Sequence, residues 1–232
     1  MLTAVKNYAD GLFHLFFPHH CIGCAAPLPK QHLLCAPCLA SLPHTNLFSV
    51  AGNPLERQFY GRVELANAGA AFYFTKHSTM QQLFFALKYK GVKEVGEFLG
   101  IEIAKEISKS PLYRDVDLIV PLPLNIRKER IRGYNQAELI ARSLARQLGI
   151  PMQTHAIERT TFTKTQTHKD RLHRWQTMER VFVVKNADAL ANKHILLIDD
   201  IVTTGATLES CALAIKAVEG TTVSLACAAW TV

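Results

Sequence analysis

The stretch Ile195-Leu-Leu-Ile-Asp199-Asp200-Ile-Val-Thr203-Thr204-Gly205-Ala206-Thr207-Leu208 decides the fold. Its first four residues are continuously apolar, as in a strand that is buried on both faces. Two carboxylates follow at the expected carboxyl end of this strand, where open α/β sheets bind their ligands. A turn of small residues then leads directly into a helix. The stretch therefore predicts an α/β protein with a ligand site at this edge of the sheet.

The turn after the acidic pair has the chemistry of a phosphate site. A helix N-terminus offers unpaired N–H groups and a partial positive charge, glycine permits close backbone approach, and threonines add hydroxyl donors. Two acids beside a phosphate would repel it, so we expect them to contact ribose hydroxyls and a hydrated magnesium ion. Ribose 5-phosphate is the most economical ligand. The predicted binding residues are Asp199, Asp200, Thr203, Thr204, Gly205, Ala206 and Thr207.

Two other interpretations of this stretch exist. In the first, Thr203 is only a helix cap and the acids merely suit the helix dipole. In the second, the pair belongs to a response-regulator receiver, but a receiver's pair follows its first strand and this one precedes the penultimate strand. The sequence contains neither a Walker A motif nor G-x-G-x-x-G, which disfavours the nucleotide-binding versions of the fold class.

The remaining pattern alternates between strands and helices from Ala70 onward. The clearest helix has apolar residues at one-face spacing from Ala137 to Leu148 and stops at Gly149. Such alternation predicts a mostly parallel sheet with helices on both faces. Further strands are expected at 70–75, 117–121, 180–184 and 222–230, and further helices at 79–89, 93–108 and 208–220. We divide the chain into an N-terminal helix and cysteine-rich module (1–45), a connector (46–69) and an α/β domain (70–232).

Four of the six cysteines form two C-x-x-C pairs near the N-terminus, with ten residues between the pairs. Cys21 and Cys24 make the first pair, and Cys35 and Cys38 make the second. Zinc takes four thiolates at tetrahedral corners about 2.3 Å from the ion, and each pair supplies two of them from one tight turn. We predict a structural zinc site, because four cysteine ligands leave no open position for a substrate.

Two disulfides are the alternative for this cluster, but nothing in the sequence indicates an oxidising compartment. A redox C-x-x-C usually occurs singly beside a βαβ unit. Cys211 and Cys227 lie on faces that we expect to be buried, as small core residues. Nearby histidines are possible substitute ligands, although surface positions account for them better: His19, His20, His32 and His44.

The excess positive charge lies in one part of the chain. Residues 121–180 hold 12 Lys or Arg against five Asp or Glu, a net charge of +7, and the rest of the chain balances. Within this stretch, residues 160–178 are polar and rich in threonine, and loops of this length are usually disordered or functional lids. A solvated surface is the plain alternative, but the position beside the predicted phosphate site favours polyanionic partners.

No apolar run is long enough to span a bilayer. The run at residues 12–17 is interrupted by His14 and lacks a basic leader and a small-residue cleavage site, so it makes a poor signal peptide. Hydrophobic residues make up 49% of the chain and charged residues 19%, which is typical of a globular protein. We expect a soluble cytoplasmic protein without membrane insertion.

Several segments together resemble one known family. Residues 199–207 resemble the motif with which type I phosphoribosyltransferases bind phosphoribosyl diphosphate (PRPP). Three further segments and the four-cysteine module extend the likeness to the ComF family of competence-associated proteins, over nearly the whole chain. The segments are Lys88-Tyr-Lys-Gly91, Val120-Pro-Leu-Pro123 and Arg132-Gly-Tyr-Asn-Gln136. The resemblance implies a type I phosphoribosyltransferase-like parallel sheet, PRPP bound with magnesium, and a small N-terminal zinc module.

The resemblance also implies roles for two loops. The segment after the Pro-Leu-Pro strand would be the pyrophosphate-side loop, with Arg132 and Gly133 at the start of the clear helix. The threonine-rich segment matches the mobile active-site loop of the superfamily. Relatives usually place Asn three residues after the arginine that matches Arg174, whereas this chain has Thr177. The matching residues of the mobile loop are Arg159, Thr165, Gln166 and Arg174.

Two functional hypotheses follow. The first is a PRPP-binding protein of natural transformation, whose basic stretch contacts single-stranded DNA or DNA-uptake proteins. Aromatic residues among the charges are candidates for stacking on bases. The second is an active phosphoribosyltransferase in nucleotide or related metabolism with no role in DNA handling, in which magnesium and basic groups stabilise the departing pyrophosphate. No catalytic residue and no acceptor substrate can be identified. The basic residues in question are Arg127, Lys128 and Arg130, and the aromatic ones are Tyr134, Phe162 and Trp175.

Overall fold

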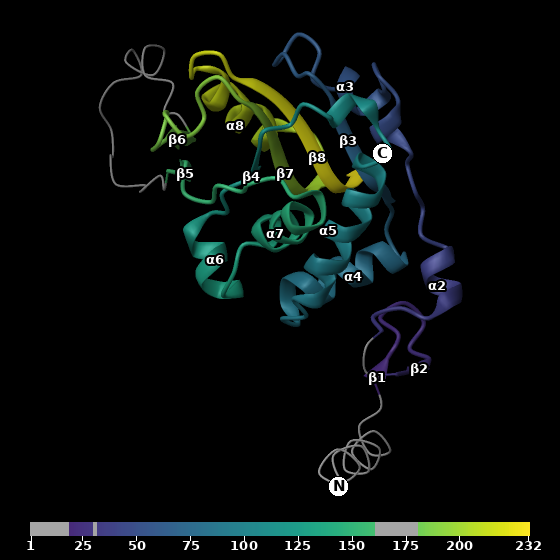
Figure 1. Cartoon of the computed structure of the whole chain (residues 1–232). Helices are drawn as coiled ribbons and strands as arrows, with labels where there is room; N and C mark the ends of the chain where they lie inside the picture. Colours follow the sequence, from purple (N-terminus) through teal and green to yellow (C-terminus); the bar gives the residue numbers. More distant parts are fainter. Residues whose placement is uncertain (1–18, 30–31, 161–180) are drawn as a thin grey trace, which may run out of the picture.

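The central feature of the protein is a sheet of four parallel strands (Figure 1). The computed structural model describes residues 19–29, 32–160 and 181–232. The strands lie in the order β3-β8-β7-β4, and every neighbouring pair is parallel. This arrangement confirms the predicted parallel α/β fold. The bounds are β3 (Ala68–Phe74), β4 (Leu118–Pro121), β7 (His194–Val202) and β8 (Thr222–Thr231).

Strand β7 is central to the sheet because it pairs with β4 on one side and with β8 on the other. Its apolar residues from Ile195 to Ile198 are fully buried, as the continuous apolar run predicts. Leu197 pairs with Val120 on β4 and with Leu225 on β8. The carboxyl ends of these strands therefore meet at one edge, and β7 carries the acidic pair there.

Helices α4, α5 and α7 cover one face of the sheet (Figure 1). Their buried residues pack in one cluster with sheet residues such as Ile119 and Ile198. Helix α7 ends immediately before Gly149, as the sequence predicts. The bounds are α4 (Thr79–Tyr89), α5 (Glu94–Ile107) and α7 (Gln136–Leu148).

The opposite face is covered by α8 (Ala206–Lys216) and by the segment from Leu47 to Val63. That segment contains a short 3-10 helix, η1 (Leu47–Ser49), and α3 (Pro54–Arg57). Asn53 caps α3 and also donates a hydrogen bond of 2.7 Å to the carbonyl oxygen of Ala68. Residues between the cysteine-rich part and β3 are thus packed against the sheet. Cys211 and Cys227 are both buried on this face, as expected.

The cysteine-rich part lies beyond α4, away from the sheet (Figure 1). It contains a two-stranded antiparallel hairpin and one short helix. The amide group of Gln82 on α4 lies against the carbonyl groups of Ile22 and Gly23, which connects the first cysteine pair to this helix. The bounds are β1 (His19–His20), β2 (Pro27–Leu28) and α2 (Ala36–Ala40).

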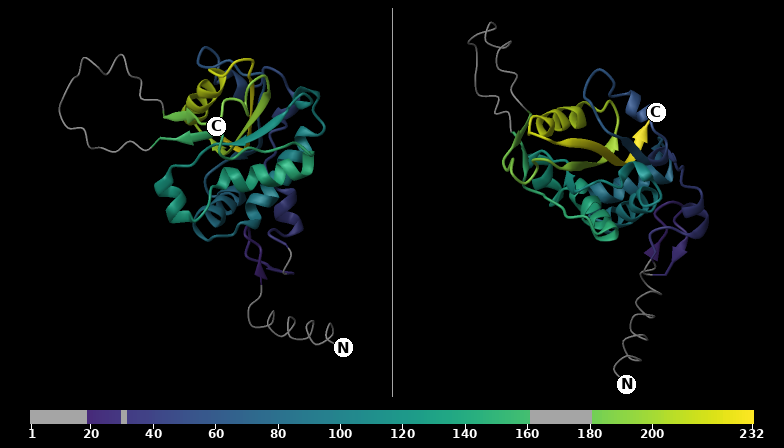
Figure 2. Two further views of the ribbon diagram at one scale, coloured as in Figure 1. Left: turned by 60° about the vertical axis from the view of Figure 1, so that its left-hand side comes forward. Right: turned by 45° about the horizontal axis from the view of Figure 1, so that its top comes forward.

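Two small elements lie at the periphery of the domain (Figure 2). Helix α6 (Ile126–Arg132) has no buried residue. Strands β5 (Ile157–Arg159) and β6 (Phe182–Val184) form an antiparallel ribbon on either side of the threonine-rich segment in the sequence. The short 3-10 helix η2 (Pro111–Tyr113) leads into β4.

Among the described residues, no helix combines the length and apolar composition needed to cross a bilayer.

Candidate functional site

The predicted phosphate turn lies between β7 and α8. Strand β7 continues three residues beyond Asp199, so both acids are part of the strand itself. Thr203 and Thr204 are exposed, and Gly205 caps α8 with a positive φ of 73°. A hollow of about 50 Å³ is lined by Asp199 and by residues 201–208. The structure therefore brings the sequence-predicted turn residues and Asp199 together around one small concavity.

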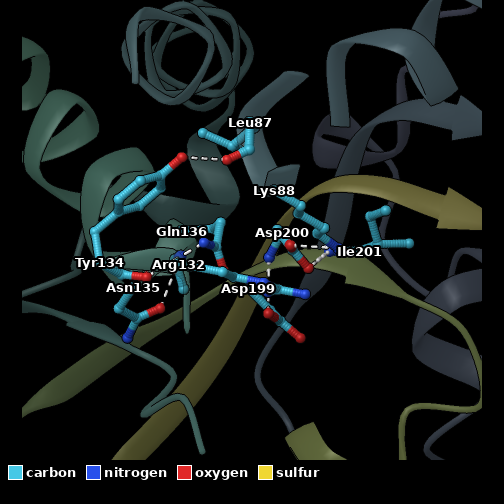
Figure 3. Close-up of polar contacts among 10 residues, drawn as sticks. Leu87, Lys88, Arg132, Tyr134, Asn135, Gln136, Asp199, Asp200 and Ile201 are labelled. Atoms are coloured by element: carbon cyan, nitrogen blue, oxygen red, sulfur yellow. Dashed lines mark hydrogen bonds and ion pairs between the residues drawn. The ribbon is translucent and has the colours of Figure 1, made fainter. Parts of the chain in front are cut away.

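The two acids point to opposite faces of the strand, because successive side chains in a strand alternate. Asp200 shares the face of Ile198, which α4, α5 and α7 cover. Asp199 shares the face of Leu197, which α8 covers. The Asp200 N–H donates to Asp199 Oδ1 at 2.8 Å, and the Ile201 N–H donates to Asp200 Oδ1 at 2.7 Å (Figure 3). The carboxylates thus lie on either side of the strand end.

The carboxyl group of Asp199 has a raised pKa. Its burial and the neighbouring Asp200 carboxylate raise the pKa of Asp199 to about 8. The Asp200 N–H and the positive charges of Lys88 and Arg159 oppose this rise in pKa. A carboxyl group that is only partly ionised near neutral pH is suited to binding a cation or a hydroxyl group, because either ligand stabilises its charged form.

Lys88 completes the site from the last turn of α4. Its Nζ lies 2.6 Å from Asp200 Oδ2, and both side chains are mostly buried, with exposed fractions of 19% and 14%. Its ammonium group is also 5.4 Å from the centre of the Phe84 ring. The sequence contains Lys88 within Lys88-Tyr-Lys-Gly91, but nothing in that pattern indicates a partner 112 residues away. The ion pair is a contact that sequence reasoning missed.

Arg132 and Gly133 lie at a joint between two helices. The sequence places them at the start of the clear helix, but Arg132 is the last residue of α6 and Gly133 is the C-cap, with a φ of 78°. The following helix α7 is capped by Asn135. This location differs from the expected one because residues 126–132, taken as part of a loop, form a helix of their own. Arg132 therefore approaches from a helix C-terminus, and its guanidinium supplies the positive charge.

Side-chain contacts fix the direction of Arg132 (Figure 3). Its Nη1 donates to Gln136 Oε1 at 2.7 Å, and its guanidinium lies 5.7 Å from the centre of the Tyr89 ring. The Tyr134 hydroxyl donates to the carbonyl oxygen of Leu87, which connects the joint to α4 near Lys88. The joint and the end of α4 therefore form one wall of the site, on the side of the acidic pair where Lys88 contacts Asp200 (Figure 3).

The residues expected in the mobile loop are only partly described. Arg159 lies at the end of β5, with its guanidinium 5.5 Å from the centre of the Phe182 ring, and its charge acts on Asp199. Thr165, Gln166 and Arg174 lie outside the described residues, as do the aromatic candidates Phe162 and Trp175.

The four cysteines near the N-terminus form a second candidate site. The sulfur atoms of Cys21, Cys24, Cys35 and Cys38 all lie within 4.8 Å of one another. A tetrahedral zinc site with bonds of about 2.3 Å has sulfur atoms about 3.8 Å apart, and the Cys24 and Cys35 sulfurs are 3.6 Å apart. The cluster therefore has the dimensions to hold a metal ion such as zinc.

The thiols of this cluster show why a cation suits it. Although burial opposes ionisation, backbone N–H groups such as those of Cys24 and Cys35 lower the pKa of Cys21 to about 6. The hydrogen bond with the Cys35 thiol, followed by burial, raises the pKa of Cys38 to about 12. Four clustered thiols cannot all ionise in isolation, and a divalent ion would relieve their mutual repulsion.

The chain shares sequence with proteins of known families. The family described as "Phosphoribosyl transferase domain" matches residues 135–230. Competence protein F of Haemophilus influenzae is 26% identical over 193 residues, which cover 83% of this chain and 76% of that protein. DNA utilization protein YhgH of Escherichia coli O157:H7 is 27% identical over an alignment that covers 81% of this chain and 74% of that protein. Competence protein ComFC of Bacillus subtilis is 33% identical over 58% of this chain and 52% of its own.

A solved structure of glutamine PRPP amidotransferase from B. subtilis aligns with 59% of this chain and 26% of its own. The TM-score is 0.45 and the sequence identity is 16%.

Proposed function

Because this chain is a phosphoribosyltransferase-like protein of the ComF family, we propose that it binds PRPP with magnesium in the cytoplasm and acts in natural competence. The names of its relatives, competence protein F, ComFC and DNA utilization protein, support the role in DNA uptake. The phosphoribosyltransferase domain and the acidic pair beside the turn support the ligand.

The proposed binding mode follows the charges around the hollow. The N–H groups at the start of α8 and the threonine hydroxyls would bind the 5-phosphate, while Asp199 and Asp200 would bind the ribose hydroxyls and magnesium. Lys88 and Arg132 lie on the other wall, where a pyrophosphate group would need positive charge. Magnesium would neutralise part of the pyrophosphate charge when bound. Arg159, Gln166 and Arg174 are proposed to contact the ligand as well; of these, the structure describes Arg159.

A single observation carries this proposal: the adjacent acids of β7 precede the turn at the start of α8, and Asp199 lines the hollow there. Calorimetry with PRPP, AMP and ribose 5-phosphate, each with and without magnesium, tests it. We expect magnesium-dependent PRPP binding that weakens roughly 100-fold or more in the Asp199→Asn/Asp200→Asn double variant, because two charge-assisted contacts disappear. Unchanged PRPP affinity in the folded double variant would show that PRPP binds at another site.

An active phosphoribosyltransferase is the alternative. Transfer would break the bond between ribose C1 and the pyrophosphate oxygen and join C1 to an acceptor, with the two phosphates leaving as pyrophosphate. Release of pyrophosphate from PRPP upon addition of an acceptor base would support this reaction. PRPP binding without turnover across the common purine and pyrimidine bases would instead support a ligand-binding role in competence.

We further propose that the four cysteines hold structural zinc. Zinc binding at such sites contributes on the order of 10 kcal/mol or more to folding. Freshly purified, reduced protein is expected to contain about one equivalent of zinc, and Cys21→Ser or Cys38→Ser is expected to unfold the cysteine-rich part. Metal analysis that finds no zinc in the reduced protein would contradict this assignment.

An exposed basic and aromatic surface supports single-stranded DNA as a partner. Tyr134 is one of three stacking candidates from the sequence and the one that the structure describes. Its hydroxyl donates to the Leu87 carbonyl oxygen, and Lys93 Nζ lies 5.2 Å from its ring centre. On α4, Phe85 and Tyr89 are exposed, and their ring centres are 5.3 Å apart. Lys90 lies over the first ring and Arg132 over the second. Base stacking on such rings contributes about 1–3 kcal/mol per base.

The salt dependence of DNA binding tests this partner. Arg127, Lys128 and Arg130 are exposed on α6, and each phosphate contact contributes about −0.7 to the log–log slope. Replacing all three with Ala is expected to flatten the slope by roughly 2 units and to leave PRPP binding largely intact. The matched control replaces Lys76, Lys109 and Arg114, which are exposed elsewhere, and is expected to change neither. If the wild type does not bind DNA and the α6 variant loses PRPP binding, the positive charge of α6 serves the pyrophosphate group and not DNA.

A further inference from the structure

The segment that follows α3 contacts the phosphate turn directly. Gln58 Nε2 donates to the carbonyl oxygen of Thr203 at 2.6 Å. Arg62 Nη1 donates to the carbonyl oxygen of Thr204 at 3.0 Å. These contacts join residues that are 145 and 142 positions apart in the sequence. Two consecutive carbonyl groups of the turn are therefore held by side chains of one short segment.

Both side chains are themselves fixed by further contacts. Trp230 Nε1 donates to Gln58 Oε1 at 3.2 Å, and because an indole nitrogen only donates, the Gln58 amide nitrogen must face Thr203. Arg62 Nε donates to Glu209 Oε2 at 3.0 Å, and Nη1 donates to the Gln58 carbonyl oxygen at 3.1 Å. Glu209 lies in the first turn of α8, so Arg62 bonds both to the turn and to the helix that follows.

Phe59 also contacts the backbone of the turn. A Cβ atom on Gly205 would lie 2.7 Å from the Phe59 ring, so the ring packs directly against the turn backbone. Phe59 is 1% exposed, and the Arg62 guanidinium lies 5.6 Å from its ring centre. Three residues of one segment thus hold the turn by hydrogen bonds and by packing.

Peptide geometry converts these contacts into a functional effect. In a trans peptide the C=O and the N–H of the next residue point in opposite directions within one plane. Holding the Thr203 and Thr204 carbonyls toward Gln58 and Arg62 turns the N–H groups of Thr204 and Gly205 the other way. Among the described residues, no carbonyl accepts a bond from either N–H group. Both donors remain available on the side of the turn away from this segment.

We propose that Gln58 and Arg62 are positioning residues that orient the turn's N–H groups toward a phosphate. The inference rests on the proposed function, because it takes the turn to be the phosphate-binding part of a PRPP site. Neither side chain needs to touch the ligand. Their effect on phosphate affinity arises from the orientation of two peptide groups, which would otherwise be free to rotate.

The test compares ligands that use different walls of the site. Gln58→Leu and Arg62→Met each remove the donor to one turn carbonyl. We expect PRPP and ribose 5-phosphate to bind each variant about 10-fold more weakly by calorimetry, the equivalent of losing one charge-assisted hydrogen bond. Magnesium pyrophosphate, bound by the Lys88 and Arg132 wall, is expected to bind within twofold of wild type. Arg57→Met is the matched control, since Arg57 is exposed and bonds only to the Gly52 carbonyl oxygen in this segment.

The outcomes separate the inference from the proposed function. Wild-type affinity for ribose 5-phosphate in both folded variants overturns the positioning role and leaves the proposed function standing. Equal weakening of all three ligands also overturns it, because a general loss of structure explains that result. Wild-type protein that binds neither PRPP nor ribose 5-phosphate overturns the proposed function and this inference together. If Arg62→Met fails to fold, Gln58→Leu decides the question alone, because its neutral side chain leaves the Arg62–Glu209 ion pair in place.

Discussion

The two walls of the candidate site are built differently. The turn wall is one continuous stretch, Asp199 to Leu208, and its conformation is fixed from behind by Phe59 and its neighbours. The helix wall is assembled from Lys88 at the end of α4 and from the joint between α6 and α7. Its glycine, Gly133, has open space around it. A short sequence motif thus specifies the chemistry of one wall, whereas tertiary packing creates the other.

A pair of glycine variants tests this difference most strongly. Gly205 and Gly133 both have positive φ values, so Ala at either position costs about 1 kcal/mol of stability from backbone strain. At Gly205 the new Cβ would also lie 2.7 Å from the buried Phe59 ring. We expect Gly205→Ala to lose about 2–4 kcal/mol in total and Gly133→Ala about 1 kcal/mol. Urea unfolding of both variants measures the free energies.

Equal losses of stability in the two variants would show that the turn wall is no more tightly packed than the helix joint. Gly205→Ala is also expected to weaken ribose 5-phosphate binding, because the displaced turn would no longer present its N–H groups. Gly133→Ala is expected to leave that affinity unchanged, since ribose 5-phosphate carries no pyrophosphate group.

The ion pair between the walls provides a second test. Lys88→Met leaves the Asp200 carboxylate mostly buried without its partner, which is expected to cost about 1–2 kcal/mol of stability after allowance for partial exposure. Adding Asp200→Asn removes the unpaired charge and is expected to restore most of the loss. Unfolding free energies of the wild type, both single variants and the double variant form the complete cycle. Strictly additive losses would mean that the two side chains do not interact.

The smallest expected effect is the pH dependence caused by Asp199. Its pKa is about 8 in the folded protein, above the usual value of 3.8, so the folded state holds a proton that the unfolded state releases. Stability should therefore fall as the pH rises from about 4 to about 8. Such a shift would correspond to roughly 4 kcal/mol between pH 5 and pH 8. Because Asp199 is partly exposed, solvent screening is expected to reduce this to about 1 kcal/mol.

Thermal unfolding of the wild type and of Asp199→Asn across this pH range measures the effect. We expect the stability of Asp199→Asn relative to the wild type to increase as the pH rises. The wild type loses stability when Asp199 ionises, whereas Asn cannot ionise. Parallel curves for the two proteins would contradict the raised pKa.

Features specified locally were predictable from the sequence. The buried strand β7 follows from its apolar run, the C-terminus of α7 from Gly149, and the cysteine cluster from C-x-x-C spacing. In each case neighbouring residues determine the structure, through burial, backbone conformation or ligand geometry. The family resemblance followed for the same reason, since its most specific motif is the continuous stretch of residues 199–207.

Features that depend on distant contacts were not predictable. The Lys88–Asp200 ion pair and the Gln58–Thr203 hydrogen bond each join segments more than 100 residues apart, and no periodicity indicates them. Helix α6 was also missed, because it has no apolar face that packs on the core and therefore lacks the pattern by which helices are recognised. Because α6 is present, Arg132 lies at the end of a helix, whereas the sequence predicted it at the start of one.

The lack of any buried residue in α6 has a consequence for how this protein can change over time. Substitutions on this helix remove no core contact, so selection for a stable fold places little constraint on residues 126–131. Its charge and surface shape are free to diverge while the sheet and the acidic pair stay the same. Within one lineage the charge and surface of the helix can therefore change, and an unchanged ligand site can come to serve a different partner.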